Sequence, residues 1–358
     1  MAEQEGHISI PFTHTCDQFT TFFYDGRVYL SDTSYPIGQC CVNIVNMDEE
    51  VLDEIDRCVE EFIPAAQALL SKKTNSAVAF AQKKLNAVWD IIFAMPVYRD
   101  LNMDLELSYH LLERLYEQKE KWAQVQDIHS EGHEIYERMI DNLAHFADRV
   151  RALRLQLRIM TEKYFEPLER RNSAAYGTAY SAFYADMLRA GALFFGEDFD
   201  QKFSVEIDFV PMTQKENESK FFVAEKMTFH YLHDFLRTEF YRGLAIGNAP
   251  RRCHNCGKYF LLTDGYNTCY CGNIAPGETE RTCRKVGAHR KEAQGKANSS
   301  PTRVEYDRTY NRLKQRKVRG KISADEWNAA VAQATQVLEQ AERGELTDDE
   351  MKKRLREF

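Results

Sequence analysis

The chain has 358 residues, which is longer than a chain that usually folds around a single hydrophobic core, so we expect two or three domains. Its 44% hydrophobic and 28% charged residues are typical of a globular protein, and the lack of an apolar run of about 18 residues argues against a membrane span. The net charge of −8 is unevenly spread: 17 Lys and Arg stand against 6 Asp and Glu between Arg251 and Lys321, which leaves −19 for the remainder.

The cellular compartment follows from the start of the chain and from its cysteines. The opening MAEQEGHISI has no basic segment followed by an apolar one, so we expect no signal peptide and a cytoplasmic location. In a reducing cytoplasm the nine cysteines are expected to be thiols or metal ligands and not a disulfide framework. The basic, cysteine-rich segment is then the candidate for contacting phosphates.

Residues 1–46 are predicted to be a β-rich N-terminal segment. The stretch QFTTFFYDGRVYLSD places two aromatic and β-branched runs around Asp25-Gly26, which is a strong signal for a β-hairpin. Residues 47–246 are predicted to form a mainly helical body. The first helix, EEVLDEIDRCVEEFI, carries an apolar stripe opposite an acidic face. The stripe consists of Val51, Ile55, Cys58, Val59 and Phe62.

The helical body is interrupted once. The run KFSVEIDFV predicts a strand that ends before Pro211. An amphipathic helix is then expected from about Phe221 to Leu244. The amino-acid composition of the chain changes at Gly247-Asn248-Ala249-Pro250, so the sequence predicts a domain boundary there.

Two further parts are expected after that boundary. The first is a zinc finger over 247–293, and a polar linker follows it. The second is a helical tail over 302–358 with three short helices. The last two helices open with Ser323-Ala-Asp-Glu326 and Thr347-Asp-Asp-Glu350. These are capping-box patterns, in which a hydroxyl and a carboxylate satisfy the free amides of the first turn.

The cysteine spacing indicates a metal site. Cys253 and Cys256 are separated by two residues, as in a zinc knuckle, and Gly257 allows the positive φ that such a turn often needs. Cys269 and Cys271 would point to opposite faces of an extended chain, so we expect only one of them to bind the ion.

A fourth ligand comes from the next segment. Cys283 begins a predicted helix, CRKVGAHRKEAQ, where a thiolate gains from the helix dipole. A knuckle on a hairpin with the last ligand at a helix start is a layout that resembles a treble clef. Residue spacing alone leaves the choice between Cys269 and Cys271 open.

The segment resembles the CGNR-type zinc fingers, bacterial C-terminal modules for which DNA binding is expected. The resemblance rests on FLRTEFYRGLAIG leading into RRCHNCGKYF, then YC at Tyr270-Cys271 and CRKVGAHR, and it covers about 110 C-terminal residues. The chain is still more similar to an uncharacterised bacterial family that ends in such a finger and a helical tail. In that pattern the third ligand follows an aromatic residue and the fourth precedes a basic one. The resemblance therefore implies one zinc ion bound by Cys253, Cys256, Cys271 and Cys283.

A site of four cysteines has no open coordination position for water, so we expect the zinc to be structural and not catalytic. The sequence contains no P-loop, no dinucleotide-binding glycine pattern, no nucleophile elbow and no H-E-x-x-H motif. We therefore expect that the protein is not an enzyme.

Basic residues surround the predicted finger and continue into the tail, where they could neutralise phosphates. Those expected to contact nucleic acid are Arg251, Arg252, Lys258, Arg284, Lys285, Arg290, Lys291, Arg308, Arg312 and Arg316. The alternative is that this basic module docks on the acidic body of its own chain or on an acidic partner protein, because charge alone does not identify its target.

The sequence as a whole predicts a mainly α protein of the α+β class, with a small β-rich N-terminal portion, a treble-clef-like zinc finger and a helical tail. The leading interpretation is a zinc-dependent nucleic-acid-binding or regulatory protein, in which the acidic body senses a ligand or partner and the finger engages DNA. The second interpretation is a zinc-stabilised protein-interaction module that does not bind nucleic acid. The oligomeric state is not specified by the sequence.

Overall fold

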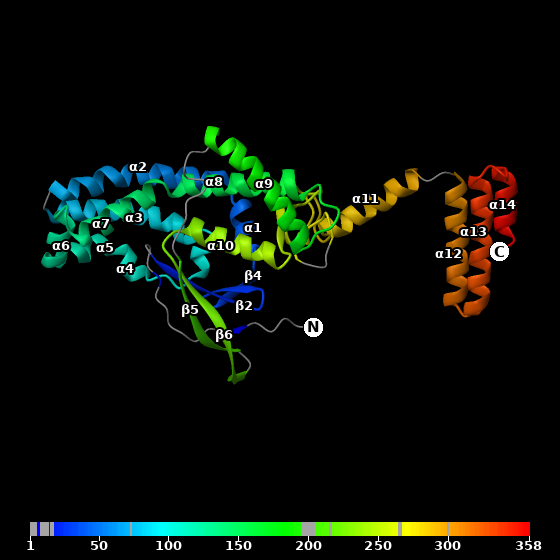
Figure 1. Cartoon of the computed structure of the whole chain (residues 1–358), viewed down its shortest axis with the longest axis horizontal. Coiled ribbons are helices and arrows are strands. Elements are labelled where there is room, and N and C mark those ends of the chain that lie inside the picture. The colour runs from blue at the N-terminus through cyan, green and yellow to red at the C-terminus, as the bar shows by residue number, and fades with distance from the viewer. Residues whose placement is uncertain are drawn as a thin grey trace. The chain divides into compact units, whose positions relative to one another are not determined.

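The computed structural model describes residues 6–7, 14, 18–71, 74–194, 205–214, 217–263, 267–298 and 301–358. The chain forms two compact units, residues 1–271 and 272–358, and each is described by itself. The architecture is mainly helical with one six-stranded antiparallel sheet, which confirms the predicted α+β class (Figure 1). Among the described residues, no helix combines the length and apolar character needed to span a bilayer.

The sheet lies in the first unit, with strand order β1-β5-β6-β2-β3-β4. Its strands are β1 (Gly6–His7), β2 (Phe19–Tyr24), β3 (Arg27–Leu30), β4 (Thr33–Pro36), β5 (Glu206–Gln214) and β6 (Asn217–Phe229). The predicted hairpin joins β2 to β3, and its turn residues Asp25 and Gly26 have φ of 46° and 72°. Positive φ at both central positions is the turn geometry that matches the twist of the flanking strands. The hairpin prediction is confirmed.

Helices build most of the first unit, and several of them pack side by side in a bundle beside the sheet (Figure 1). The helical elements are α1 (Gln39–Val45), α2 (Glu49–Ser71), α3 (Asn75–Ala94), η1 (Tyr98–Asp100), α4 (Leu105–Tyr109), α5 (Leu111–Glu117), α6 (Lys119–Gln126), α7 (Glu131–Ala144), α8 (Phe146–Ile159), η2 (Met160–Phe165), α9 (Ser173–Phe194) and α10 (Leu232–Ala245). Phe19 and Phe229 of the sheet contact Phe235 of α10, so sheet and helices share one core.

The amphipathic helix predicted from Phe221 to Leu244 is wrong over its first half. Residues up to Phe229 belong to β6, which pairs with β5 on one side and β2 on the other, and the helix begins only at Leu232. A short apolar run does not by itself distinguish a strand from a helix. Pairing with β2, more than 200 residues earlier in the chain, decides the outcome, and a local pattern cannot show it.

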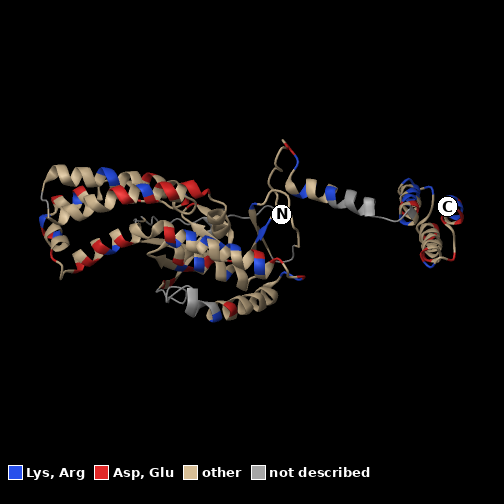
Figure 2. Cartoon of the chain, turned by 90° about the horizontal axis from the view of Figure 1, so that it is seen from above, with Lys and Arg blue, Asp and Glu red and all other residues tan. Residues whose placement is uncertain are grey.

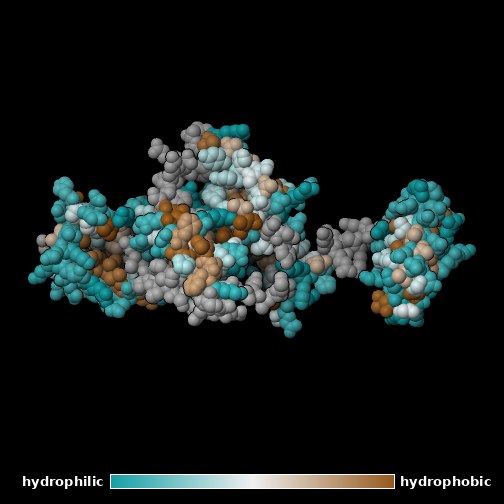
Figure 3. All heavy atoms as spheres, turned by 60° about the horizontal axis from the view of Figure 1, so that its bottom comes forward, coloured by the Kyte–Doolittle hydropathy of each residue, from teal (hydrophilic) through white to brown (hydrophobic). Residues whose placement is uncertain are grey.

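The sheet also exposes apolar side chains. Ile207 and Phe209 of β5 and Phe221 and Val223 of β6 are more than half exposed. Figure 3 shows patches of apolar residues on this side of the first unit. The strand predicted to end before Pro211 continues through it: β5 reaches Gln214, with Pro211 opposite Val223 of β6, and pairs with the described residues of β1 only at Thr213 and Gln214. The missing N–H of Pro211 therefore costs no hydrogen bond to the described part of β1.

The buried His14 provides a pH-dependent contribution to stability. Its Nδ1 accepts a hydrogen bond from the Thr20 N–H at 3.1 Å, and burial lowers its pKa from 6.5 to about 4. Because the folded-state pKa is below the unfolded value, the contribution is present above pH 6.5 and is lost as pH falls towards 4.

We expect this histidine to account for a loss of about 2 kcal/mol in the free energy of unfolding between pH 7 and pH 4.5. Urea denaturation at the two pH values would measure it. The His14→Gln variant, which does not titrate, should show a correspondingly weaker pH dependence. A His14→Gln variant whose stability depends on pH as strongly as that of the wild type would contradict the assignment.

The second unit contains α11 (Cys283–Asn298), α12 (Pro301–Val318), α13 (Ala324–Glu342) and α14 (Asp348–Arg356). Helices α12, α13 and α14 pack around a small core of their own. The core residues are Tyr306, Ala334, Val337, Leu338, Met351 and Leu355. Both predicted capping boxes are present, at Ser323 with Glu326 and at Thr347 with Glu350. The three predicted tail helices are therefore confirmed.

Candidate metal centre

A tight hairpin carries the first two cysteines of the site. Strands β7 (Ala249–Arg252) and β8 (Tyr259–Leu262) pair antiparallel, with Arg252 opposite Tyr259. Between them the Cys253 N–H donates to the Lys258 carbonyl at 2.8 Å, and the Gly257 N–H donates back to the Cys253 carbonyl at 2.9 Å. Gly257 has φ of 76°, the conformation expected for it from the sequence. The turn places Cys253 and Cys256 on one knuckle.

Two further cysteines come from later segments. The Cys271 N–H donates to the Cys253 Sγ at 3.3 Å, which places Cys271 against the knuckle. Cys283 is the first residue of α11, and its N–H donates to the Asn273 carbonyl at 2.8 Å. The Thr282 hydroxyl accepts from the Lys285 N–H at 3.3 Å and so caps the first turn of α11.

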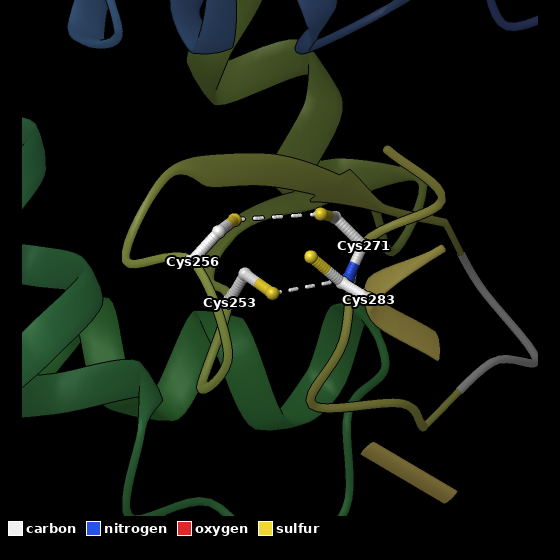
Figure 4. A group of neighbouring side chains, drawn as sticks. All are labelled: Cys253, Cys256, Cys271 and Cys283. Carbon is white, nitrogen blue, oxygen red and sulfur yellow. Dashed lines mark hydrogen bonds between the residues drawn. The ribbon is translucent and has the colours of Figure 1, made fainter. Parts of the chain in front are cut away.

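The sulfur atoms of Cys253, Cys256, Cys271 and Cys283 all lie within 4.8 Å of one another and point towards a common centre (Figure 4). The Cys256 and Cys271 sulfurs are 3.7 Å apart. Four thiolates around zinc at about 2.3 Å would be separated by about 3.8 Å along each edge of the tetrahedron. Three of the four residues are buried and Cys256 is partly buried. The geometry and the soft donor set therefore fit a bound metal ion.

The surroundings of Cys253 favour its thiolate. Burial alone would raise the pKa of this thiol, but backbone N–H groups from Cys271, Cys256 and Asn255 lower it to about 7. A thiolate is the form of cysteine that binds a metal. The knuckle thus stabilises the charge state that a metal ligand requires.

Cys269 lies outside this group of four. Its Sγ accepts a hydrogen bond from the Arg251 guanidinium at 3.1 Å, and its carbonyl accepts from the His254 N–H at 2.9 Å. Of the two cysteines that residue spacing left open, the structure brings Cys271 to the other three thiols.

The knuckle is fastened to the helices of the first unit. Asn46, which follows α1, donates to the Tyr259 carbonyl at 2.7 Å and accepts from the Tyr259 N–H at 2.8 Å. The Tyr259 hydroxyl donates to Glu162 of η2, and His254 Nε2 lies 2.8 Å from Glu166. Half of the predicted finger is therefore an integral part of the first unit.

One predicted nucleic-acid contact does not fit its environment. Arg251 is 5% exposed, and its guanidinium donates to side-chain and backbone groups of its own chain. A buried guanidinium whose two terminal nitrogens both donate within the protein has no exposed face to offer a phosphate. We therefore leave Arg251 out of the proposed nucleic-acid contacts.

The other predicted basic residues fall into two groups. Those exposed near the cysteines are Arg252, Lys258, Arg284, Lys285 and Arg290. In the tail, Arg308 pairs with Glu305 at 2.6 Å. Arg312 donates to the Leu355 carbonyl in α14, and Arg316 donates to the Phe358 carbonyl, two residues after α14. The side chain of Lys291 lies outside the part that the structure describes. Figure 2 shows acidic and basic residues interspersed along the helices of the first unit and basic residues on the described part of α11.

The contacts of Glu166, Glu162 and Asn46 were not visible in the sequence, because their partners lie between 85 and 213 positions away. Nothing in their local patterns marks them, since an exposed acid on a helix is ordinarily a solvated residue. Only the cysteines carried a signal in their spacing.

Fold and site together define a mainly helical α+β protein with a four-cysteine cluster that could hold a metal ion. Residues 200–357 match a family of unknown function, DUF6076. The match runs from the region of β5 to the end of α14 and includes all four cysteines, and it supports the predicted likeness to an uncharacterised family. The likeness to CGNR-type fingers stays a prediction. No curated protein and no solved structure matches the chain.

Proposed function

We propose that Cys253, Cys256, Cys271 and Cys283 bind one zinc ion whose role is structural. Four thiolates are a donor set that suits zinc, and they leave no coordination position for water or substrate. The supporting observation is the convergence of four sulfur atoms from the knuckle, the following loop and the start of α11. The ion would hold these segments together and perform no chemistry of its own.

The function proposed for this zinc centre is to present a nucleic-acid-binding segment. Helix α11 begins at one of the four cysteines, and its described part exposes Arg284, Lys285 and Arg290. Cations fixed on a helix can neutralise successive phosphates of a duplex. A protein-interaction module is the second candidate. Arg308, Arg312 and Arg316 of the tail already bind groups of their own chain, which leaves fewer cations in the tail for phosphates.

Binding to DNA can be tested with the full-length, zinc-loaded chain. We expect it to bind a fluorescein-labelled duplex in an anisotropy titration, with an affinity that falls steeply as salt rises. The double variant Arg284→Ala/Lys285→Ala should bind at least about tenfold more weakly at low salt, and the slope of log K against log salt should decrease by about 2.

The matched control removes two exposed lysines from the first unit, Lys119→Ala/Lys121→Ala, and should bind as the wild type does. Equal losses in both double variants would show that binding follows net charge and not α11. A zinc-loaded wild type that does not bind DNA at low salt would contradict the nucleic-acid proposal and favour the interaction module.

A further inference from the structure

A buried arginine links the knuckle to the loop that carries the third cysteine. Arg251 Nη1 donates to the Asn267 side chain at 3.1 Å and to the Thr268 carbonyl at 2.9 Å. Its Nη2 lies 3.1 Å from the Cys269 sulfur. Arg251 stands two residues before Cys253, and the segment it binds ends two residues before Cys271. One side chain therefore fixes the approach to two of the four sulfurs.

The charge of this arginine is balanced from the helical part of the first unit. Glu166 follows η2, a π-helical turn that its N–H completes by donating to the Thr161 carbonyl at 2.9 Å. Its Oε1 lies 3.3 Å from Arg251 Nη2 and 2.8 Å from His254 Nε2. His254 stands between Cys253 and Cys256, so Glu166 contacts residues on both sides of the first sulfur.

Glu166 is itself held in place. Arg171, which is buried, donates to the Phe165 carbonyl at 2.8 Å and to the Glu166 carbonyl at 2.8 Å. These bonds therefore fix the backbone that carries the carboxylate independently of its contacts with the knuckle. A carboxylate on a fixed backbone, which also lies 3.8 Å from Arg171, loses less conformational freedom when it binds Arg251, and this makes the contact an effective support.

We propose that Arg251 and Glu166 are positioning residues of the metal centre, which set its affinity for metal without touching the ion. The inference rests on the proposed zinc site. It adds two residues to that site that cysteine spacing in the sequence does not identify. Groups that orient metal ligands through hydrogen bonds typically change metal affinity by 10- to 100-fold when they are replaced. Arg251 and Glu166 occupy that role because they fix the segments on which Cys253, Cys256 and Cys271 stand.

The same contacts couple the metal to the helical core. If Glu166 strengthens metal binding, then metal binding must strengthen the attachment of Glu166 by the same factor, because the coupling of two equilibria is reciprocal. Metal should therefore raise the melting temperature of the first unit in the wild type, and it should raise it less in a Glu166 variant.

The test uses full-length apo-protein titrated with Co²⁺ or Zn²⁺ in competition with a chromophoric chelator. We expect Arg251→Lys and Glu166→Gln each to bind metal 10- to 100-fold more weakly than the wild type. The absorption bands of the Co²⁺ complex should keep their positions, because the four sulfurs are unchanged. A lysine keeps the charge of Arg251 but cannot reproduce its fork of donors. Arg170→Lys and Glu169→Gln, at exposed positions close to Glu166, are the matched controls and should bind as the wild type does.

The outcomes separate this inference from the proposed function. A wild type that takes up no metal would overturn the zinc site itself. A wild type that binds one equivalent, together with Arg251 and Glu166 variants of unchanged affinity, would overturn only the positioning role. If Arg251→Lys does not fold, then His254→Gln, which alters a side chain that is about half exposed, removes one Glu166 contact and provides the same measurement.

Discussion

Replacing Cys271 with serine is expected to abolish stoichiometric metal binding and to unfold the cysteine-rich segment. A serine hydroxyl does not ionise near neutral pH and is a poor zinc ligand, so three thiolates would remain around an ion that prefers four. Binding of structural zinc contributes more than about 10 kcal/mol to the folding of isolated finger peptides. Metal analysis of the purified variant, together with hydrogen exchange over residues 249–290, would measure both effects.

The matched control is Cys269→Ser, only two residues away. Its sulfur contacts Arg251 and lies outside the group of four, so this variant should keep one equivalent of metal. Chelation of the wild type should reproduce the exchange pattern of Cys271→Ser, and restored zinc should reverse it in the wild type alone. If Cys269→Ser lost the metal while Cys271→Ser kept it, the ligand set would be wrong.

Where a local pattern determines an element, the sequence predicted it. The turn at Asp25 and Gly26 needs two residues that tolerate positive φ, and both capping boxes are defined within four residues. The strand up to Phe229 was missed because its assignment depends on β2 and β5 and not on its own period. A turn or a helix cap can be predicted from neighbouring residues, whereas strand pairing over more than 200 residues cannot.

The candidate site divides in the same way. Two residues between Cys253 and Cys256, followed by Gly257, define the knuckle locally, and the structure has that turn. Arg251 appeared to be one more surface cation, because its formal charge is visible in the sequence and its burial is not. Its partner Glu166 lies 85 positions earlier, at the end of a π-helical turn that no sequence motif predicts. Net charge over a segment therefore overstates the cations available to a partner.

A fully buried carboxylate in the first unit, that of Glu239, is expected to contribute strongly to the free energy of unfolding. Glu239 of α10 is 0% exposed, and its Oε1 accepts from the Gly38 N–H at 2.6 Å and the Cys40 N–H at 3.1 Å. Its Oε2 accepts from the Cys41 N–H at 3.1 Å. These are free amides at the start of α1, where no hydroxyl or carboxylate from a capping residue is present, since Gly38 has φ of 104° and no side chain. Glu239 caps α1 from another helix.

Glu239→Ala should therefore lower the free energy of unfolding by about 4 kcal/mol, because it leaves three buried N–H groups without acceptors and opens a cavity. Glu239→Gln should lose about half as much, since its amide oxygen keeps the Gly38 and Cys40 bonds while its NH₂ meets the Cys41 N–H. Chemical denaturation followed by circular dichroism would measure both, with the exposed Glu60→Ala on α2 as a control that should change stability by less than about 0.5 kcal/mol. A Glu239→Ala variant as stable as Glu60→Ala would show that water or a shifted backbone replaces the carboxylate, and that α1 does not depend on α10 for its cap.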